Sequence, residues 1–90
     1  MTYSISAEGL ALVQAHEGFR AEPQPLSESA WVVGYGHIRA GAPGAPVSES
    51  EASQLLSIDL APVERMVNAH VTARLTQAQF DALVSFAVSV

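Results

Sequence analysis

Residues 17–37 read EGFRAEPQPLSESAWVVGYGH, and this stretch decides how the chain folds. Its two prolines exclude a helix, because proline lacks the backbone N–H and its ring clashes with the preceding turn. Residues 27–29, SES, are typical of a turn, and residues 31–33, WVV, favour a strand. Residues 34–36, GYG, allow a second tight bend. The pattern therefore predicts a small antiparallel sheet or hairpin.

A helix is predicted before this stretch, and its last residue is a glutamate. Ser6 is a suitable N-cap, and Gly18 is a suitable stop. Leu10, Val13 and Glu17 fall at i, i+3 and i+7, so they share one helical face. On that face Glu17 has two interpretations. It is either a partly buried carboxylate suited to act as a general acid, or a solvated glutamate in the last turn.

Two capping boxes predict two further helices. Residues 48–51 spell S-x-x-E, and residues 76–79 spell T-x-x-Q. Between them, Pro62 interrupts an apolar stripe at helical spacing, so we expect the earlier helix to kink or restart there.

The last predicted helix, residues 76–90, is apolar around nearly its whole circumference. A helix of this kind has to be surrounded by protein. No capping signal follows Val90, so we expect that the covering elements are missing or that other copies of the chain supply them. The sequence therefore predicts a homo-oligomer or a domain swap through residues 76–90.

The composition excludes several classes of function. The chain has 90 residues with nine acidic and four basic side chains, which gives a formal net charge of −5. This balance argues against nucleic acid as a partner, because phosphate recognition needs clustered Lys and Arg. Cysteine is absent, and His16, His37 and His70 lack the spacing of a metal site. We expect neither a metal nor a cofactor.

The length predicts a single domain over residues 1–90. The N-terminus lacks the basic region and unbroken apolar core of a signal peptide, and no stretch is long and apolar enough to span a membrane. We expect a cytoplasmic location for the chain as written, and a cell-envelope location if it belongs to a longer protein.

Four motifs occur in an order that identifies a family. They are E-G-x-R at 17–20, V-G-Y-G-H at 33–37, S-E-x-E-A-x-x-L-L-x-x-D-L at 48–60 and L-T-Q-x-Q-F-D-A-L-V-S-F-A at 75–87. Together they resemble the phage-type lysozymes, glycoside hydrolase family 24, over nearly the full length of the chain. The resemblance covers the family's N-terminal lobe and leaves its C-terminal helical lobe without a counterpart, so the domain is truncated relative to the family.

The resemblance implies an α+β fold with a β-hairpin lobe and a cleft between two lobes. It also implies hydrolysis of the β-1,4 bond between N-acetylmuramic acid and N-acetylglucosamine, with the peptidoglycan glycan strand as partner. Family members use a Glu at the end of the first helix, an Asp nine residues later and a Thr fifteen residues later. His37 and Asp59 match an ion pair that joins sheet and helix in the family.

This catalytic set carries over only in part. Glu17 matches the general acid, whereas Leu26 stands where the Asp belongs and Val32 where the Thr belongs. The register is fixed, because Gly34 and His37 fall at the family's spacing from the glutamate. Two of the three catalytic side chains have therefore lost their oxygen atoms.

Two functions follow from this partial match. The first is a degenerate muramidase domain that acts as a glycan-binding or self-associating scaffold, with low or no enzyme activity. The alternative is a weakly active lysozyme in which Glu28 replaces the missing Asp, since Glu28 lies two residues past Leu26 and would share its face in a strand. Leu26, in place of the Asp that follows E-G-F-R in the family, also occurs in the lysozyme-like domain of SpmX-type proteins of alphaproteobacteria. Those proteins are developmental scaffolds, and the resemblance to them favours the first function.

Overall fold

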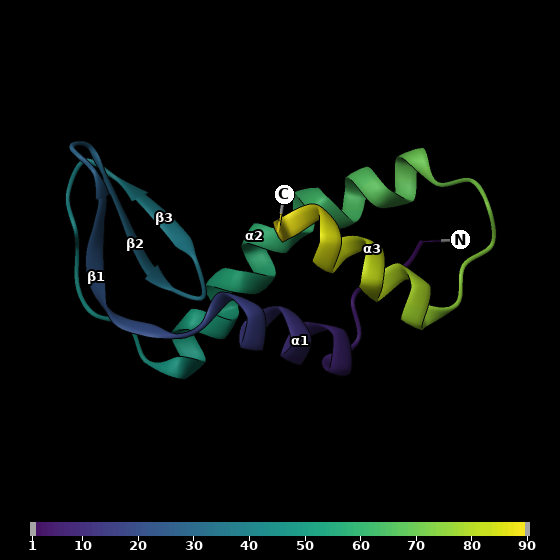
Figure 1. Ribbon diagram of the computed structural model, residues 1–90, viewed down its shortest axis with the longest axis horizontal. Coiled ribbons are helices and arrows are strands. Elements are labelled where there is room, and N and C mark those ends of the chain that lie inside the picture. Colours follow the sequence, from purple (N-terminus) through teal and green to yellow (C-terminus); the bar gives the residue numbers. More distant parts are fainter. Residues whose placement is uncertain (1, 90) are drawn as a thin grey trace. The chain divides into compact units, whose positions relative to one another are not determined.

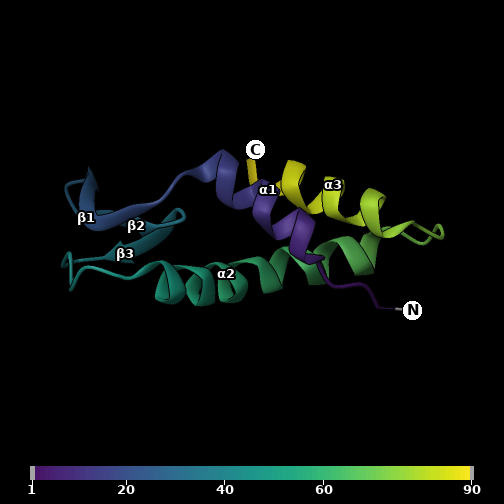
Figure 2. The ribbon, with the colours of Figure 1, turned by 90° about the horizontal axis from the view of Figure 1, so that it is seen from below.

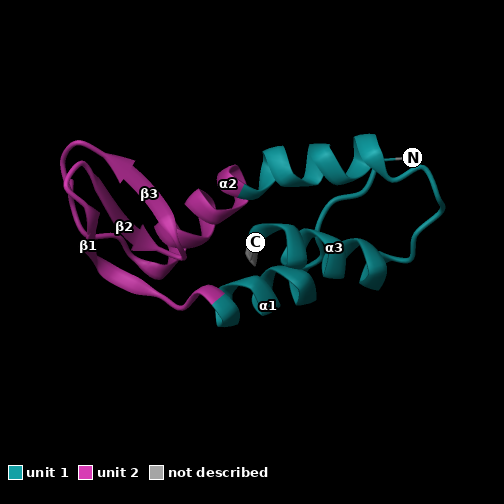
Figure 3. Ribbon diagram, turned by 45° about the horizontal axis from the view of Figure 1, so that its top comes forward, with its two compact units in different colours: residues 1–16, 60–90 teal, residues 17–59 magenta. Residues whose placement is uncertain are grey.

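A computed structural model describes residues 2–89 of the chain. The elements follow one another as α1 (Ala7–Glu17), β1 (Arg20–Ser27), β2 (Ala30–Gly34), β3 (His37–Ala40), α2 (Glu49–His70) and α3 (Gln77–Ser89) (Figure 1). The fold is α+β, as the sequence predicted. Its residues form two compact units, a sheet unit of residues 17–59 and a helical unit of residues 1–16 and 60–90 (Figure 3).

The sheet of the sheet unit has three antiparallel strands in the order β1-β2-β3. Val33 on β2 is fully buried and forms a small core with Val47 and Ala52, against which Tyr35 and Leu55 pack. The predicted small antiparallel sheet is therefore confirmed, with turns at residues 28–29 and 35–36.

The first strand contains both prolines that excluded a helix. Proline cannot donate to a neighbouring strand, so it is confined to edge strands and irregular positions. β1 is an edge strand, and its register shifts between Arg20 and Gln24 and again between Pro25 and Ser27. The prolines thus set the place of this strand in the sheet.

Helix α2 begins at the first predicted capping box. The Ser48 N–H donates to Glu51 Oε1 at 3.0 Å, and the Glu51 N–H donates to Ser48 Oγ at 3.1 Å. We predicted a kink or a restart at Pro62. The helix continues through this proline to His70, so a restart is wrong, and a kink stays a prediction. One missing bond to the Ile58 carbonyl is tolerated, because α2 buries Leu56, Leu60 and Val67 along its length.

Helix α3 begins at the second capping box. The Thr76 N–H donates to Gln79 Oε1 at 2.8 Å, and the Gln79 N–H donates to Thr76 Oγ1 at 3.1 Å. Phe80 and Val84 on this helix are fully buried. Leu83 is 37% exposed and Phe86 is 70% exposed, so an apolar part of the helix surface meets solvent. Val90, the end of the predicted helix, lies outside the described residues.

Helices α1 and α3 lie side by side in the helical unit (Figures 1 and 2). Gly9 allows this approach, because a Cβ at that position would lie 2.5 Å from Cγ of Asp81. Asp81, only 8% exposed, accepts bonds from the Ser6 N–H, the Ser6 hydroxyl and the Gln77 amide. Burial acts to raise the pKa of Asp81, but the bonds from Ser6 and Gln77 outweigh it and hold that pKa below its ordinary value. We call these four residues the Asp81 latch.

Residues 3–6, the N-terminal strap, are held through their backbone. The Asn68 amide accepts from the Tyr3 N–H at 2.9 Å and donates to the Tyr3 carbonyl at 3.0 Å. Glu64 accepts from the Ile5 N–H at 2.8 Å. The Tyr3 ring stacks on Phe80 with centroids 5.3 Å apart. The strap therefore ties α2 and α3 together at the start of α1.

Candidate active site

Glu17 is the last residue of α1, and local signals place it there. The Ser6 hydroxyl accepts from the Gly9 N–H at 3.1 Å and caps the helix start, as predicted. Gly18 has φ +75°, the left-handed conformation that ends helices, and it follows Glu17 directly. The Glu17 residue is half-buried. Its exposure lies between the two alternatives from sequence, a partly buried general acid and a solvated glutamate.

The Glu17 carboxylate lies against the turn that joins β2 to β3. A Cβ at Gly36 would lie 2.9 Å from Glu17 Oε2, and Gly36 has φ +84°. The positive φ favours glycine at this position, and a larger residue would also displace the end of the Glu17 side chain. Arg20 donates from Nη1 to the carbonyl of Glu17 at 3.4 Å, so its cation bonds the backbone and not the carboxylate.

Leu26 and Val32 occupy the positions nine and fifteen residues after Glu17. Leu26 is 59% exposed near the end of β1. Val32 is half-buried in the middle strand, paired with Gln24 on β1 and with Ile38 on β3. Neither side chain can accept a hydrogen bond or orient a water molecule.

Glu28, the candidate replacement for the missing Asp, is not part of a strand. β1 ends at Ser27, and Glu28 is an exposed residue of the turn that follows. The register between β1 and β2 is also irregular between Pro25 and Ser27. The alternation that would return Glu28 to the face of Leu26 does not extend to this residue.

Two further contacts shape the sheet unit. His37 Nδ1 and Asp59 Oδ2 lie 2.9 Å apart, so the contact between sheet and helix that the family resemblance implied is confirmed. Arg39 donates from Nη1 to the carbonyls of Pro43 at 2.6 Å and Ala45 at 2.7 Å, which fixes the loop after β3. Both contacts hold the fold of the sheet unit.

The three histidines are spread over different elements. His37 pairs with Asp59, and His70 Nδ1 lies 2.9 Å from the Met66 carbonyl. Over residues 2–89, no group of three or more His, Asp or Glu side chains is placed to hold a metal ion. These described residues also contain no helix with the length and apolar character needed to cross a membrane.

Sequence reasoning missed three structural roles. The contact of Gly36 with Glu17 was hidden, because the glycine was assigned only to a bend. Asp81 lies in a motif that indicated a family but no contact, and its partner Gly9 lies 72 positions earlier. A glycine inside the α1 pattern was the available signal, since glycine in a helix marks a close approach. The strap carried no signal, because side chains hold its backbone.

The chain is similar in sequence to known phage proteins. A profile described as phage lysozyme matches residues 14–90. The endolysin of Acyrthosiphon pisum secondary endosymbiont phage 1 is 31% identical over 86 residues, which cover 96% of this chain and 59% of the endolysin. This chain therefore belongs to the phage lysozyme family.

Solved structures agree with this assignment. The muramidase domain of SpmX from Asticaccaulis excentricus superposes with a TM-score of 0.89 at 41% identity, covering 97% of this chain and 59% of that one. A mutant of P22 lysozyme gives a TM-score of 0.87 at 28% identity, covering 99% of this chain and 64% of that one. The chain thus spans about three-fifths of the length of these relatives.

Proposed function

We propose that this chain is a lysozyme-like domain that binds peptidoglycan glycan strands and hydrolyses them slowly or not at all. One observation carries the proposal. Beside the retained Glu17, the two positions that should supply oxygen atoms hold Leu26 and Val32. Membership in the phage lysozyme family and similarity to endolysins support peptidoglycan as the ligand.

Magnitudes favour binding over catalysis. A positioned general acid contributes a factor of about 10²–10⁴, whereas enzymes accelerate their reactions by roughly 10⁶ or more. Glu17 is the only member of the family's catalytic set in this chain. Its contribution leaves most of the required acceleration without a source.

The proposal includes a scaffold role through self-association. Leu83 and Phe86 on α3 and Met66 on α2 are each more than a third exposed. Contiguous apolar surface of this kind marks interaction sites. A second copy of the chain is the proposed partner, and analytical ultracentrifugation at micromolar concentration tests this part. A clean monomer at every concentration would contradict it.

Two measurements on purified peptidoglycan test the main proposal. In co-sedimentation, the parent chain and Glu17→Gln should bind insoluble peptidoglycan equally. In a reducing-end assay, sugar release by both should stay at the background of a control without protein. Release that Glu17→Gln abolishes would establish an enzyme, and loss of the same release in Glu28→Gln would show that Glu28 supplies the second carboxylate. The control variant is Glu22→Gln, at an exposed site on β1.

A further inference from the structure

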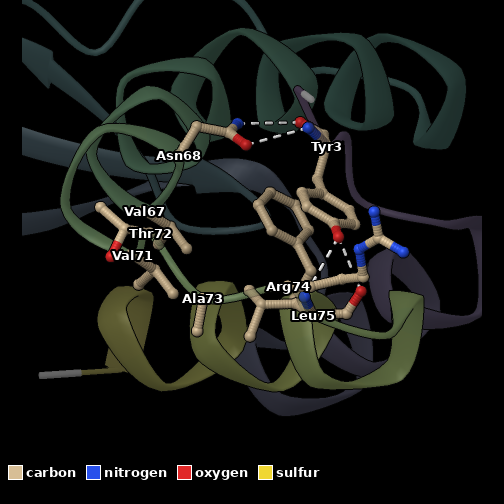
Figure 4. Close-up of a pocket in the computed structure, with 9 residues that line it drawn as sticks. Tyr3, Val67, Asn68, Val71, Thr72, Ala73, Arg74 and Leu75 are labelled. Atoms are coloured by element: carbon tan, nitrogen blue, oxygen red, sulfur yellow. Dashed lines mark hydrogen bonds between the residues drawn. The ribbon is translucent and has the colours of Figure 1, made fainter.

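The hollows on the surface of the helical unit are of two kinds. The largest, about 390 Å³, lies beside the N-terminal strap, and hydrogen bonds join its walls. The Tyr3 hydroxyl donates to the Leu75 carbonyl at 2.7 Å and accepts from the Leu75 N–H at 3.1 Å (Figure 4). The Asn68 amide bonds the backbone of Tyr3 (Figure 4). This hollow therefore belongs to the contacts that hold the strap, whereas the others are apolar grooves.

Two apolar grooves flank Phe86 on α3. One lies between α2 and α3 and has a volume of about 270 Å³, and the other lies between α1 and α3 and has a volume of about 290 Å³. Phe86 lines both grooves and is 70% exposed, so its ring stands between them. Met66 and Leu83 in the first groove and Leu12 in the second are also more than a third exposed. We call these four exposed apolar side chains with their two grooves the Phe86 surface.

The Phe86 surface is uncharged at neutral pH. The chain has nine acidic and four basic side chains, but among residues 2–89 none of them lines either groove. The carboxylates of the neighbouring elements have other contacts, since Asp81 belongs to the latch and Glu64 accepts from the strap. Glu17, which follows His16 on α1, lies against Gly36. Glu8, Arg65 and Arg74 line neither groove.

One histidine lines each groove. His16 lies on α1 and His70 on α2, and both are exposed. His70 Nδ1 lies 2.9 Å from the carbonyl of Met66. A carbonyl can only accept, so Nδ1 carries the proton and Nε2 is the nitrogen that gains one in acid. Histidine changes its charge between about pH 5 and 8, so these grooves contain the groups that can charge the Phe86 surface in mild acid.

We propose that the Phe86 surface pairs with the same surface of a second copy of the chain, and that protonation of His16 and His70 separates the two copies. In a two-fold contact each Phe86 can enter a groove of the other copy, because ring and grooves lie on one surface. Neutral imidazoles can be buried at such a contact, whereas imidazolium cations would lose their hydration against apolar walls. The inference rests on the self-association in the proposed function and adds its regulation.

The overall charge of the chain predicts the opposite dependence on pH. The formal net charge is −5 with neutral histidines, and their protonation reduces it, so repulsion between copies weakens as the pH falls. A contact governed by overall charge would tighten in mild acid, whereas the contact at the Phe86 surface should loosen. The pKa of Asp81 is held below its ordinary value, so the latch keeps its charge in mild acid and the fold should persist.

Sedimentation of the full chain at about pH 7.5 and about pH 5.5, at one ionic strength, tests the proposal. We expect association at the higher pH and at least about tenfold weaker association at the lower one, because cations are expelled from the contact. His16→Gln combined with His70→Gln should associate with the same dissociation constant at both pH values. Phe86→Ala should abolish association at both.

A third histidine supplies the matched control. His37 pairs with Asp59 in the sheet unit and lines neither groove, so His37→Gln should keep the pH dependence of the parent chain. Circular dichroism at both pH values checks that each variant is folded. Equal loss of the pH dependence in His37→Gln and in the double variant would overturn the assignment to His16 and His70.

The outcomes separate this inference from the proposed function. A monomer at both pH values overturns self-association and the inference with it. Association that does not weaken in acid, or that weakens as much in the double histidine variant, overturns only the histidine control. Association that survives Phe86→Ala overturns the assignment to the Phe86 surface. Binding to peptidoglycan is measured separately, so its absence overturns the glycan part of the proposed function and leaves the inference intact.

Discussion

The two units differ in the partners that surround one carboxylate in each, the half-buried Glu17 and the buried Asp81. In the sheet unit, the residues nine and fifteen positions after Glu17 are the apolar Leu26 and Val32. In the helical unit, Asp81 is bonded by the Ser6 N–H, the Ser6 hydroxyl and Gln77, with Gly9 making room for it. The polar partners of Asp81 are therefore complete, and its carboxylate serves the fold. Under the proposed function, Leu26 and Val32 leave the Glu17 carboxylate without the partners through which a lysozyme would act.

The largest expected effect comes from restoring the missing oxygen atoms. Leu26→Asp combined with Val32→Thr should raise reducing-end release by about 10²-fold over the parent chain, because a positioned carboxylate and hydroxyl can orient and activate water. Adding Glu17→Gln to the double variant should return the rate to the parent level. An unchanged rate in a folded double variant would show that the loss of activity does not lie at these two positions.

Removal of the Asp81 carboxylate gives the next largest effect. Asp81→Ala should lower the free energy of unfolding by about 2–3 kcal/mol, since it leaves the donors of Ser6 and Gln77 without their acceptor. Asp59→Ala is the matched control in the sheet unit. Its pair with His37 is partly exposed, so it should cost under about 1 kcal/mol. Urea denaturation measures both, and equal losses would contradict the contrast between the units.

Sequence reasoning was accurate where local chemistry decides structure. The capping pairs at Ser48 and Thr76 fixed the starts of α2 and α3, and Gly18 fixed the end of α1. The turns and the short sheet followed from residues within a few positions of one another. The family assignment rested on motif order, and the profile match confirmed it.

Sequence reasoning failed where distant residues cooperate. Pro62 breaks an isolated helix, but burial of residues on both sides keeps α2 continuous. Gly9 and Asp81 explain each other only once α1 and α3 are adjacent. For the site, motif spacing predicts Glu17 as the general acid, with Leu26 and Val32 at the positions of its partners, and this stays a prediction. The proximity of Gly36 to Glu17 Oε2 could not be predicted, because backbone proximity leaves no mark in a single sequence.

Acid should weaken the helical unit through the same latch. The pKa of Asp81 is lowered in the folded chain, so its stabilisation is fully present above the unfolded value of about 3.8 and is lost as the pH falls through the folded value. The contribution of Asp81 should therefore be constant from pH 7 to about pH 4 and should be lost as the pH falls further. Asp81→Asn should show a flatter profile over this range, because it has no carboxylate to protonate. Parallel profiles in urea titrations would remove Asp81 as a source of the pH dependence.

The smallest expected effect compares one capping box in each unit. Ser48→Ala and Thr76→Ala should each cost about 1 kcal/mol at pH 7, because each removes one side-chain acceptor from a helix start. Their reciprocal partners differ, since Glu51 is charged and Gln79 is neutral. Hydrogen bonds from the backbone N–H and the side chain of Ser48 lower the pKa of Glu51. This box therefore stabilises the helix fully above the ordinary pKa of glutamate, and it weakens as the pH falls through the pKa of Glu51 in the folded chain.

The Thr76 box contains no group that titrates in this range. The cost of Ser48→Ala should therefore shrink between pH 7 and pH 3, whereas the cost of Thr76→Ala should stay constant. Glu51→Gln converts the first box into the chemistry of the second and should make the two responses alike. A cost of Ser48→Ala that does not change with pH would show that the charge of Glu51 adds nothing to the cap, and that the two boxes are equivalent in spite of their different acceptors.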